Sequence, residues 1–310
     1  MPEVKEFYFE STTGKNRIFA KKVIPDSAPK GIVQIAHGFA GHTDRFRDFM
    51  LFLAENGYVA VANDHLGHGR SITSPDEQGY FAEKDGWSYA VGDMEKLHDI
   101  IAAEYPELPY VLYGHSMGSF LTRTYLIQHP DKYDAAILSG TGHQSRVLIS
   151  SALLLLELLV KLVGPKRPAT ALNNVAFVVY NRAFRPRRTN YDWLSRDTAE
   201  VDKYIADPMC GFVARTSLYR DMMKGIRFIT DTKNIRSMSR TPPIFFMAGT
   251  MDPVGENGKG VQKAYRAFCD AGLKDVSIRL YPGGRHELLN ELNKKEIYAD
   301  ILAWLGRKIG

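Results

Sequence analysis

The stretch from Pro109 to Phe120 constrains this chain most, because it places a serine between two glycines where a strand is expected to give way to a helix. An apolar run comes first, then Gly114-His-Ser-Met-Gly118, then the opening of a helix. A sharp turn of this kind lifts the serine hydroxyl clear of the sheet, while Gly114 and Gly118 let strand and helix approach closely. Ser116 is therefore the candidate nucleophile.

The pattern of the remaining elements predicts an α/β fold with a mostly parallel central sheet and helices on both faces. An antiparallel hairpin is expected over residues 4–9 and 17–24. Apolar strands are expected at 31–37, 58–62, 109–113, 133–138, 244–249 and 276–281, and helices at 43–56, 87–105, 117–129, 259–271 and 294–305. Strands that are apolar along their whole length are typical of parallel sheets buried on both faces.

The rhythm of strands and helices breaks after Gly140. Residues 141–240 are rich in helix-forming residues and are interrupted by Gly-Pro, Arg-Pro and Asp-Pro pairs, which predicts an inserted helical cap. Residues 1–140 and 241–310 then form the two parts of one core, and a chain of 310 residues is long enough for this arrangement.

Composition excludes some partners. The net charge of +5 comes from 40 basic and 35 acidic residues spread along the chain, a bias too weak to indicate nucleic acid. Residues 1–10 have mixed charge and no apolar centre, so they do not resemble a signal peptide. Cys210 and Cys269 lie far apart, and we expect a reduced, cytoplasmic protein with two free thiols. The sequence gives no signal for an oligomeric state.

A serine nucleophile needs a base and an acid that orients the base, and both follow Ser116 in the chain. Asp252 lies in the loop after the strand that follows the cap, and His286 lies in the glycine-rich loop after the last strand. Each position is just past the carboxyl end of a strand, where ligands bind in open α/β sheets. Glu256 and Glu287 are the alternative acids.

The donors for an oxyanion are expected to be backbone N–H groups. One belongs to Met117, directly after the nucleophile, and the other to Phe39 in the loop after the first apolar strand. His37 is expected to brace this loop by hydrogen bonds, and His115 is expected to be a packing residue that points away from the serine hydroxyl.

Four histidines flank two neighbouring strands, which raises the question of a metal site. They are His37, His42, His65 and His68. No helical pair of histidines four residues apart and no neighbouring cysteine accompanies them, so we expect no metal. No motif in the chain calls for a cofactor.

With these residues in place, the chain resembles the α/β-hydrolase superfamily, and within it the group of lysophospholipases and monoacylglycerol lipases that is also described as serine aminopeptidase-type hydrolases. The resemblance rests on His37-Gly-Phe39, Asp64-His-Leu-Gly-His-Gly-Arg-Ser71, Gly114-His-Ser-Met-Gly118, Gly249-Thr-Met-Asp-Pro-Val254, 281–290, 192–197 and 207–211. It covers nearly the whole chain and implies a Ser-His-Asp triad. The chain departs from the mammalian lipases after the first His-Gly, where Ala40-Gly-His-Thr43 replaces a Gly-Glu-His pattern.

Residues 147–163 form the most apolar run, with only Glu157 and Lys161 charged, and the run is too short and too charged to predict a membrane span. Such a helix must bury against the core, a partner or lipid. Two interpretations remain open: packing on the core, or a lid that holds the acyl chain and contacts a membrane surface transiently. The second assigns substrate contacts to Leu153, Leu155, Leu156 and Leu159.

The basic cluster of Arg182, Arg185, Arg187 and Arg188 is compatible with anionic lipid, although a solvated face is the simpler interpretation.

The sequence therefore predicts a serine hydrolase for carboxylic esters with an apolar acyl group, such as a monoacylglycerol or a lysophospholipid. A peptidase or amidase with the same triad is the alternative, followed by a catalytically silent binding protein on the same scaffold.

Overall fold

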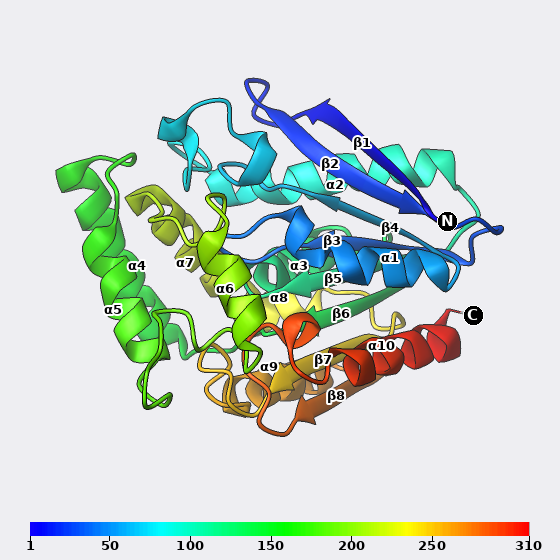
Figure 1. Cartoon of the computed structure of the whole chain (residues 1–310). Coiled ribbons are helices and arrows are strands. Elements are labelled where there is room, and N and C mark those ends of the chain that lie inside the picture. Colours follow the sequence, from blue (N-terminus) through cyan, green and yellow to red (C-terminus); the bar gives the residue numbers. More distant parts are fainter. Residues whose placement is uncertain (310) are drawn as a thin grey trace.

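The computed structural model describes residues 1–309, and its strands form one mixed sheet of eight strands within that range (Figure 1). In spatial order the strands are β1 (Glu3–Glu10), β2 (Arg17–Ile24), β4 (Tyr58–Asn63), β3 (Gly31–Ala36), β5 (Tyr110–His115), β6 (Ala135–Ser139), β7 (Ile244–Gly249) and β8 (Val276–Tyr281). The β1–β2 and β2–β4 pairs are antiparallel, and all pairs from β4 to β8 are parallel. The predicted α/β fold with a mostly parallel sheet is confirmed.

Five helices of the core cover the two faces of the sheet. They are α1 (Arg47–Glu55), α2 (Gly86–Glu104), α3 (Met117–Gln128), α9 (Lys259–Asp270) and α10 (Lys294–Lys308). Apolar residues of α1 and α10 form one core cluster with the sheet, and those of α2, α3 and α9 form the other. Because both faces are covered, strands β3 to β7 are buried along their full lengths, as their continuous apolar runs predict.

The helix expected over 43–56 is shorter than predicted, because its first turn, Thr43–Phe46, is a 3₁₀ helix and α1 begins only at Arg47. The other expected elements of the core agree with the structure to within a few residues.

The segment between β6 and β7 is helical, as expected for a cap. It contains α4 (Arg146–Val163), α5 (Thr170–Tyr180), α6 (Thr198–Ala206), α7 (Thr216–Ile229) and α8 (Thr232–Arg236). Helix α7 packs against α2 and α3 of the core on one side and against α4 on the other. Helices α4 and α5 lie farthest from the sheet, at the left of Figure 1.

Helix α4 has one buried stripe and one exposed apolar face. Its buried residues, Ile149, Leu153, Leu156 and Val160, recur at helical spacing. The exposed apolar side chains of α4 and α5 are Val147, Leu148, Leu154, Leu155, Leu158, Leu162, Val163, Val175, Val178 and Val179. Within residues 1–309 neither α4 nor any other helix combines the length and the apolar character that crossing a membrane requires.

Candidate active site

Ser116 stands at the turn between β5 and α3 in a strained backbone conformation, with φ 54° and ψ −122°. Its N–H donates a hydrogen bond of 2.9 Å to the carbonyl of Ser139 at the end of β6. A β-carbon at Gly114 or Gly118 would come within 2.4 or 2.0 Å of neighbouring atoms, so both positions require glycine. The predicted elbow is present, and the Ser116 side chain is half-buried.

Asp252 and His286 meet as predicted, although 34 positions separate them in the sequence. The Nδ1 atom of His286 lies 2.9 Å from the Oδ1 atom of Asp252, and both residues are buried. Asp252 follows β7 and His286 follows β8, so the parallel pairing of these strands brings the two loops together.

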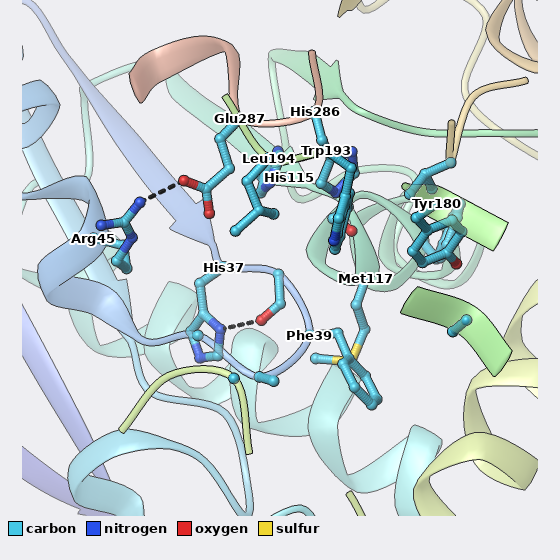
Figure 2. Close-up of a pocket in the computed structure, with 18 of the residues that line it drawn as sticks. His37, Phe39, Arg45, His115, Met117, Tyr180, Trp193, Leu194, His286 and Glu287 are labelled. Carbon is cyan, nitrogen blue, oxygen red and sulfur yellow. Dashed lines mark hydrogen bonds and ion pairs between the residues drawn. The ribbon is translucent and has the colours of Figure 1, made fainter. Parts of the chain in front are cut away.

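The two alternative acids have other partners. Glu256 forms an ion pair with Lys263 on α9, and Glu287 forms one with Arg45 (Figure 2). Neither carboxylate contacts the His286 ring through a hydrogen bond within residues 1–309. Asp252 is therefore the carboxylate in position to orient this imidazole.

Two other aromatic rings pack near the His286 ring. The centroid of His115 is 4.7 Å away, and the centroid of Trp193 is 5.0 Å away (Figure 2). His115 packs as expected, but against the imidazole of His286 itself. Burial, reinforced by His286, lowers the pKa of His115 to about 3, so this neighbour is uncharged at neutral pH. Sequence reasoning missed Trp193 as a site residue; its one signal was its place in the segment 192–197, which is part of the family resemblance.

The loop after β3 lies beside the serine. A β-carbon on Gly38 would come within 3.1 Å of the Ser116 Cβ atom. The N–H groups of Phe39 and Met117 have no hydrogen-bond acceptor within residues 1–309. The Met117 N–H is also the first of its helix, where backbone donors lack intrahelical partners. Both groups are thus free to donate to a ligand at Ser116.

His37 braces this loop, as the sequence predicts. Its Nε2 atom accepts a hydrogen bond of 2.9 Å from the His65 N–H, so the proton is on Nδ1, which donates to the Gly38 carbonyl at 2.8 Å. Burial lowers the pKa of His37 to about 3, and the neutral ring keeps this donor and acceptor pattern across the working pH range.

Of the four histidines considered for a metal, the rings of His37 and His68 pair with the backbone and that of His42 with Asp207. The ring of His65 is buried, with its Nδ1 atom 3.5 Å from the Asn63 side-chain amide. Within residues 1–309, the one group of three potential ligands whose donor atoms come within 4.8 Å of one another is His42, Asp207 and Cys210. In that group the His42 Nε2 atom lies 2.8 Å from Asp207, so imidazole and carboxylate satisfy each other. Burial raises the pKa of the Cys210 thiol, which opposes the thiolate form that binds metals. Cys210 and Cys269 are both free thiols, as predicted.

A cavity of about 230 Å³ opens at Ser116 and His286. One part of its wall is apolar and is formed mainly by Phe39, Phe120, Ala176, Phe177, Tyr180, Tyr219, Met222, Met223, Ile226 and Val254. Another part is polar and is formed by His42, Arg45, Glu287 and Asn290. Figure 2 shows Arg45 and Glu287 on one side of the pocket and Tyr180 on the other.

The ion pair in the polar wall carries no excess positive charge. Arg45 pairs with Glu287 and has a second carboxylate, that of Glu200, at 3.9 Å. Burial alone would raise the pKa of Glu287, but Arg45 outweighs it and lowers the pKa below the usual range, so Glu287 is ionised.

The four leucines assigned to the acyl site are not part of the cavity wall. The cap lines the cavity through α5, α7, Tyr204 of α6 and the loop residues Trp193, Leu194, Gly211 and Phe212, and no residue of α4 contributes. Leu153 and Leu156 are buried in the stripe of α4, and α4 packs against α7. Leu155 points to solvent, with 67 % of its surface exposed. In this structure the apolar run forms a helix that covers α7 from outside, and Leu159 is half-buried within it.

Solved structures agree with this architecture. A highly thermostable carboxyl esterase from Bacillus coagulans, crystallised with glycerol, superposes with a TM-score of 0.92 at 29 % identity, over 99 % of each chain. The mixed sheet, the elbow serine at its carboxyl edge and the inserted cap define the α/β-hydrolase fold.

The chain belongs to the serine aminopeptidase S33 family, whose profile matches residues 27–293. Among characterised relatives, it is 28 % identical to a monoacylglycerol lipase of Mycolicibacterium smegmatis over 91 % of this chain and 90 % of that protein. It is 31 % identical to a caffeoylshikimate esterase of Arabidopsis thaliana over 97 % of this chain and 85 % of that protein.

Proposed function

We propose that this chain is a serine hydrolase that cleaves carboxylic esters with an apolar acyl group. The observation that carries the proposal is the buried pair of His286 and Asp252, joined at 2.9 Å, in a cavity that also exposes the elbow serine. A catalytically silent binding protein would have no use for this arrangement. The names of the relatives, a monoacylglycerol lipase and two esterases, support the same reaction class.

In the proposed mechanism His286 removes the proton of Ser116 as its Oγ atom attacks the ester carbonyl. Asp252 holds the Nδ1–H of His286 and stabilises the imidazolium. The N–H groups of Phe39 and Met117 bind the oxyanion. Loss of one such donor typically costs about 3 kcal/mol of barrier. His286 then protonates the leaving alcohol, and water releases the acid from the acyl-enzyme.

The two walls of the cavity suit the two halves of an ester substrate. The apolar wall from α5 and α7 suits an acyl chain, where each buried CH₂ contributes about 0.8 kcal/mol. The polar wall suits the alcohol. Because Arg45 is already neutralised by Glu287, with Glu200 nearby, a neutral polyol is favoured there over the phosphate of a lysophospholipid. A monoacylglycerol is therefore the preferred natural substrate.

The same argument disfavours an aminopeptidase. A free α-amino group needs a carboxylate partner in the site, and the Glu287 carboxylate in the cavity wall is engaged by Arg45. The exposed apolar face of α4 and α5, followed directly by the basic cluster 182–188, further suits transient contact with a lipid surface that delivers such substrates.

The decisive experiment compares p-nitrophenyl esters of rising acyl length with an aminoacyl-p-nitroanilide. We expect kcat/KM to rise from acetate to medium-chain esters and to be negligible for the anilide. Preferential cleavage of the anilide would reassign the chain to the peptidases. Absence of turnover on every substrate, with fluorophosphonate labelling also absent, would favour a binding protein.

A further inference from the structure

The loop that carries Phe39 is held by hydrogen bonds on successive peptide groups. The carbonyl of Gly38 accepts from His37 at 2.8 Å, and the N–H of Ala40 donates to the Nε2 atom of His68 at 3.3 Å. Because the peptide unit is planar and trans, holding the Gly38 carbonyl also directs the Phe39 N–H to the opposite side. The partners in both hydrogen bonds, His37 and His68, belong to the core.

The cap also holds this loop by hydrogen bonds. The carbonyl of Ala40 accepts one hydrogen bond from the Tyr204 hydroxyl at 3.0 Å and another from the Gly211 N–H at 2.9 Å. Tyr204 lies on α6 and is buried, and the Gly211 N–H also donates to its hydroxyl at 3.1 Å. Burial raises the pKa of Tyr204 well above its usual range, so the hydroxyl keeps the proton it donates.

Ala40 needs this support because its backbone is strained. Its φ of 50° lies in the left-handed region, which costs a residue other than glycine on the order of 1 kcal/mol or more. Such a conformation persists only where its surroundings hold it. Without the Tyr204 hydrogen bond, the backbone of Ala40 can move toward a less strained conformation. The adjacent Phe39 N–H would then no longer point at the proposed oxyanion position.

The same part of the cap also holds the loop of the base. The N–H of His286 donates to the Trp193 carbonyl at 3.3 Å, and the N–H of Glu287 donates to the Leu194 carbonyl at 2.7 Å. Residues 192–211 thus bridge the loop after β3 and the loop after β8.

From these contacts we infer that Tyr204 is a positioning residue for the oxyanion donor Phe39, and that residues 192–211 are a fixed part of the catalytic apparatus. The inference rests on the proposed function, because it assigns the Phe39 N–H to the oxyanion.

The test is Tyr204→Phe, which removes one hydroxyl and keeps the ring. The matched control is Tyr191→Phe, because Tyr191 packs on Tyr204 at 5.0 Å but donates its hydrogen bond to the Gly211 carbonyl. With p-nitrophenyl butyrate we expect Tyr204→Phe to lower kcat about tenfold with KM unchanged. The affinity for an aliphatic trifluoromethyl ketone, which places an oxyanion in the same hole, should fall by the same factor. Tyr191→Phe should retain both values.

Three outcomes would overturn the inference: wild-type kcat in Tyr204→Phe, an equal loss in the control, or a loss of kcat with unchanged affinity for the ketone. A lowered melting temperature cannot imitate the expected result, because partial unfolding lowers the active fraction without changing the affinity of the folded remainder. If Ser116→Ala retains full activity, the proposed function fails. If only that variant is inactive and Tyr204→Phe behaves as wild type, the inference alone fails.

Discussion

The Nδ1 atom of His286 lies 2.9 Å from Asp252, while the next residue in the chain, Glu287, turns its carboxylate to Arg45. The two carboxylates therefore have different partners. Asp252 is placed to orient the base, and Glu287 neutralises the only arginine that lines the cavity within residues 1–309.

Replacing the elbow serine should abolish ester hydrolysis. In Ser116→Ala the acyl-enzyme cannot form, so we expect kcat to fall on the order of 10⁴-fold or more with little change in melting temperature. Mass spectrometry after treatment of the wild type with a fluorophosphonate should find one adduct, on Ser116. An adduct on another serine would contradict the assignment of the nucleophile.

Removing the charge of the orienting acid should reduce turnover but spare the nucleophile. We expect Asp252→Asn to lower kcat about 10⁴-fold, because the amide favours the wrong tautomer of His286, while fluorophosphonate labelling remains detectable. Glu256→Gln is the matched control on the same loop and should stay near wild type, since its partner Lys263 is a surface lysine. The reverse pattern would make Glu256 the acid.

The apolar wall should select for acyl length. In Met223→Gln a polar group of similar size enters the wall from α7, so we expect kcat/KM for the decanoate ester to fall about tenfold relative to the acetate ester. Leu155→Gln, on the exposed face of α4, should leave this ratio unchanged. If Leu155→Gln is the variant that lowers the ratio, the acyl chain lies under α4 after all.

The exposed face of α4 should matter only on lipid surfaces. We expect Leu155→Gln with Leu158→Gln to weaken sedimentation with phosphatidylcholine vesicles and to slow hydrolysis of a long-chain monoacylglycerol in them. Hydrolysis of dissolved p-nitrophenyl butyrate and the melting temperature should not change. Undiminished vesicle binding would show that this face does not contact lipid.

Stability should depend on pH through Asp93, a buried carboxyl that joins α2 to the first hairpin. Burial raises its pKa to about 6 against the opposing hydrogen bonds of Thr12 and Ser11. A raised folded pKa means that the folded state binds the proton more tightly, so the free energy of unfolding should fall as pH rises from 4 to 6. A difference of about two units between the folded and unfolded pKa values of Asp93 corresponds to a loss of about 3 kcal/mol in the free energy of unfolding.

Chemical unfolding across this pH range would measure that dependence. Asp93→Asn has no carboxyl to titrate at this position. The free energy of unfolding of the wild type, relative to that of the variant, should therefore fall as pH rises. A difference that grows in favour of wild type with rising pH would mean that the hydrogen bonds outweigh burial.

The sequence predicts the core of this molecule well because local patterns determine it. The bounds of β7 and β8 agree residue for residue with their apolar runs, and the elbow glycines are recognisable from the tight approach they permit. The contact between Asp252 and His286 was predictable because loops after parallel strands share one edge of the sheet.

Contacts between the cap and the core were not predictable in the same way. Trp193 reaches the His286 ring, and Tyr204 on α6 reaches the Ala40 carbonyl, only because residues 192–211 fold back across two loops of the core. The place of the α4 leucines was not predictable for a related reason. An apolar helix must bury one face, but its composition does not say whether that face meets a cavity or the back of another helix.

The contacts between the cap and the loops after β3 and β8 come from one segment of the cap, which affects how this chain can diversify. Every cap contact described here with these two loops comes from residues 192–211. Helix α4 instead packs along α7, and Tyr180 at the end of α5 lies 4.8 Å from the Trp193 ring. None of the hydrogen bonds described here joins the α4–α5 hairpin to the loops of Ser116, Asp252 and His286, so this hairpin is the part of the cap best suited to exchange. Grafting residues 146–180 from a relative would replace Ala176, Phe177 and Tyr180, three of the ten residues of the apolar wall, and the exposed apolar face of α4 and α5. Recombination could thus change the substrate range while the loops of Ser116 and His286 stay in place.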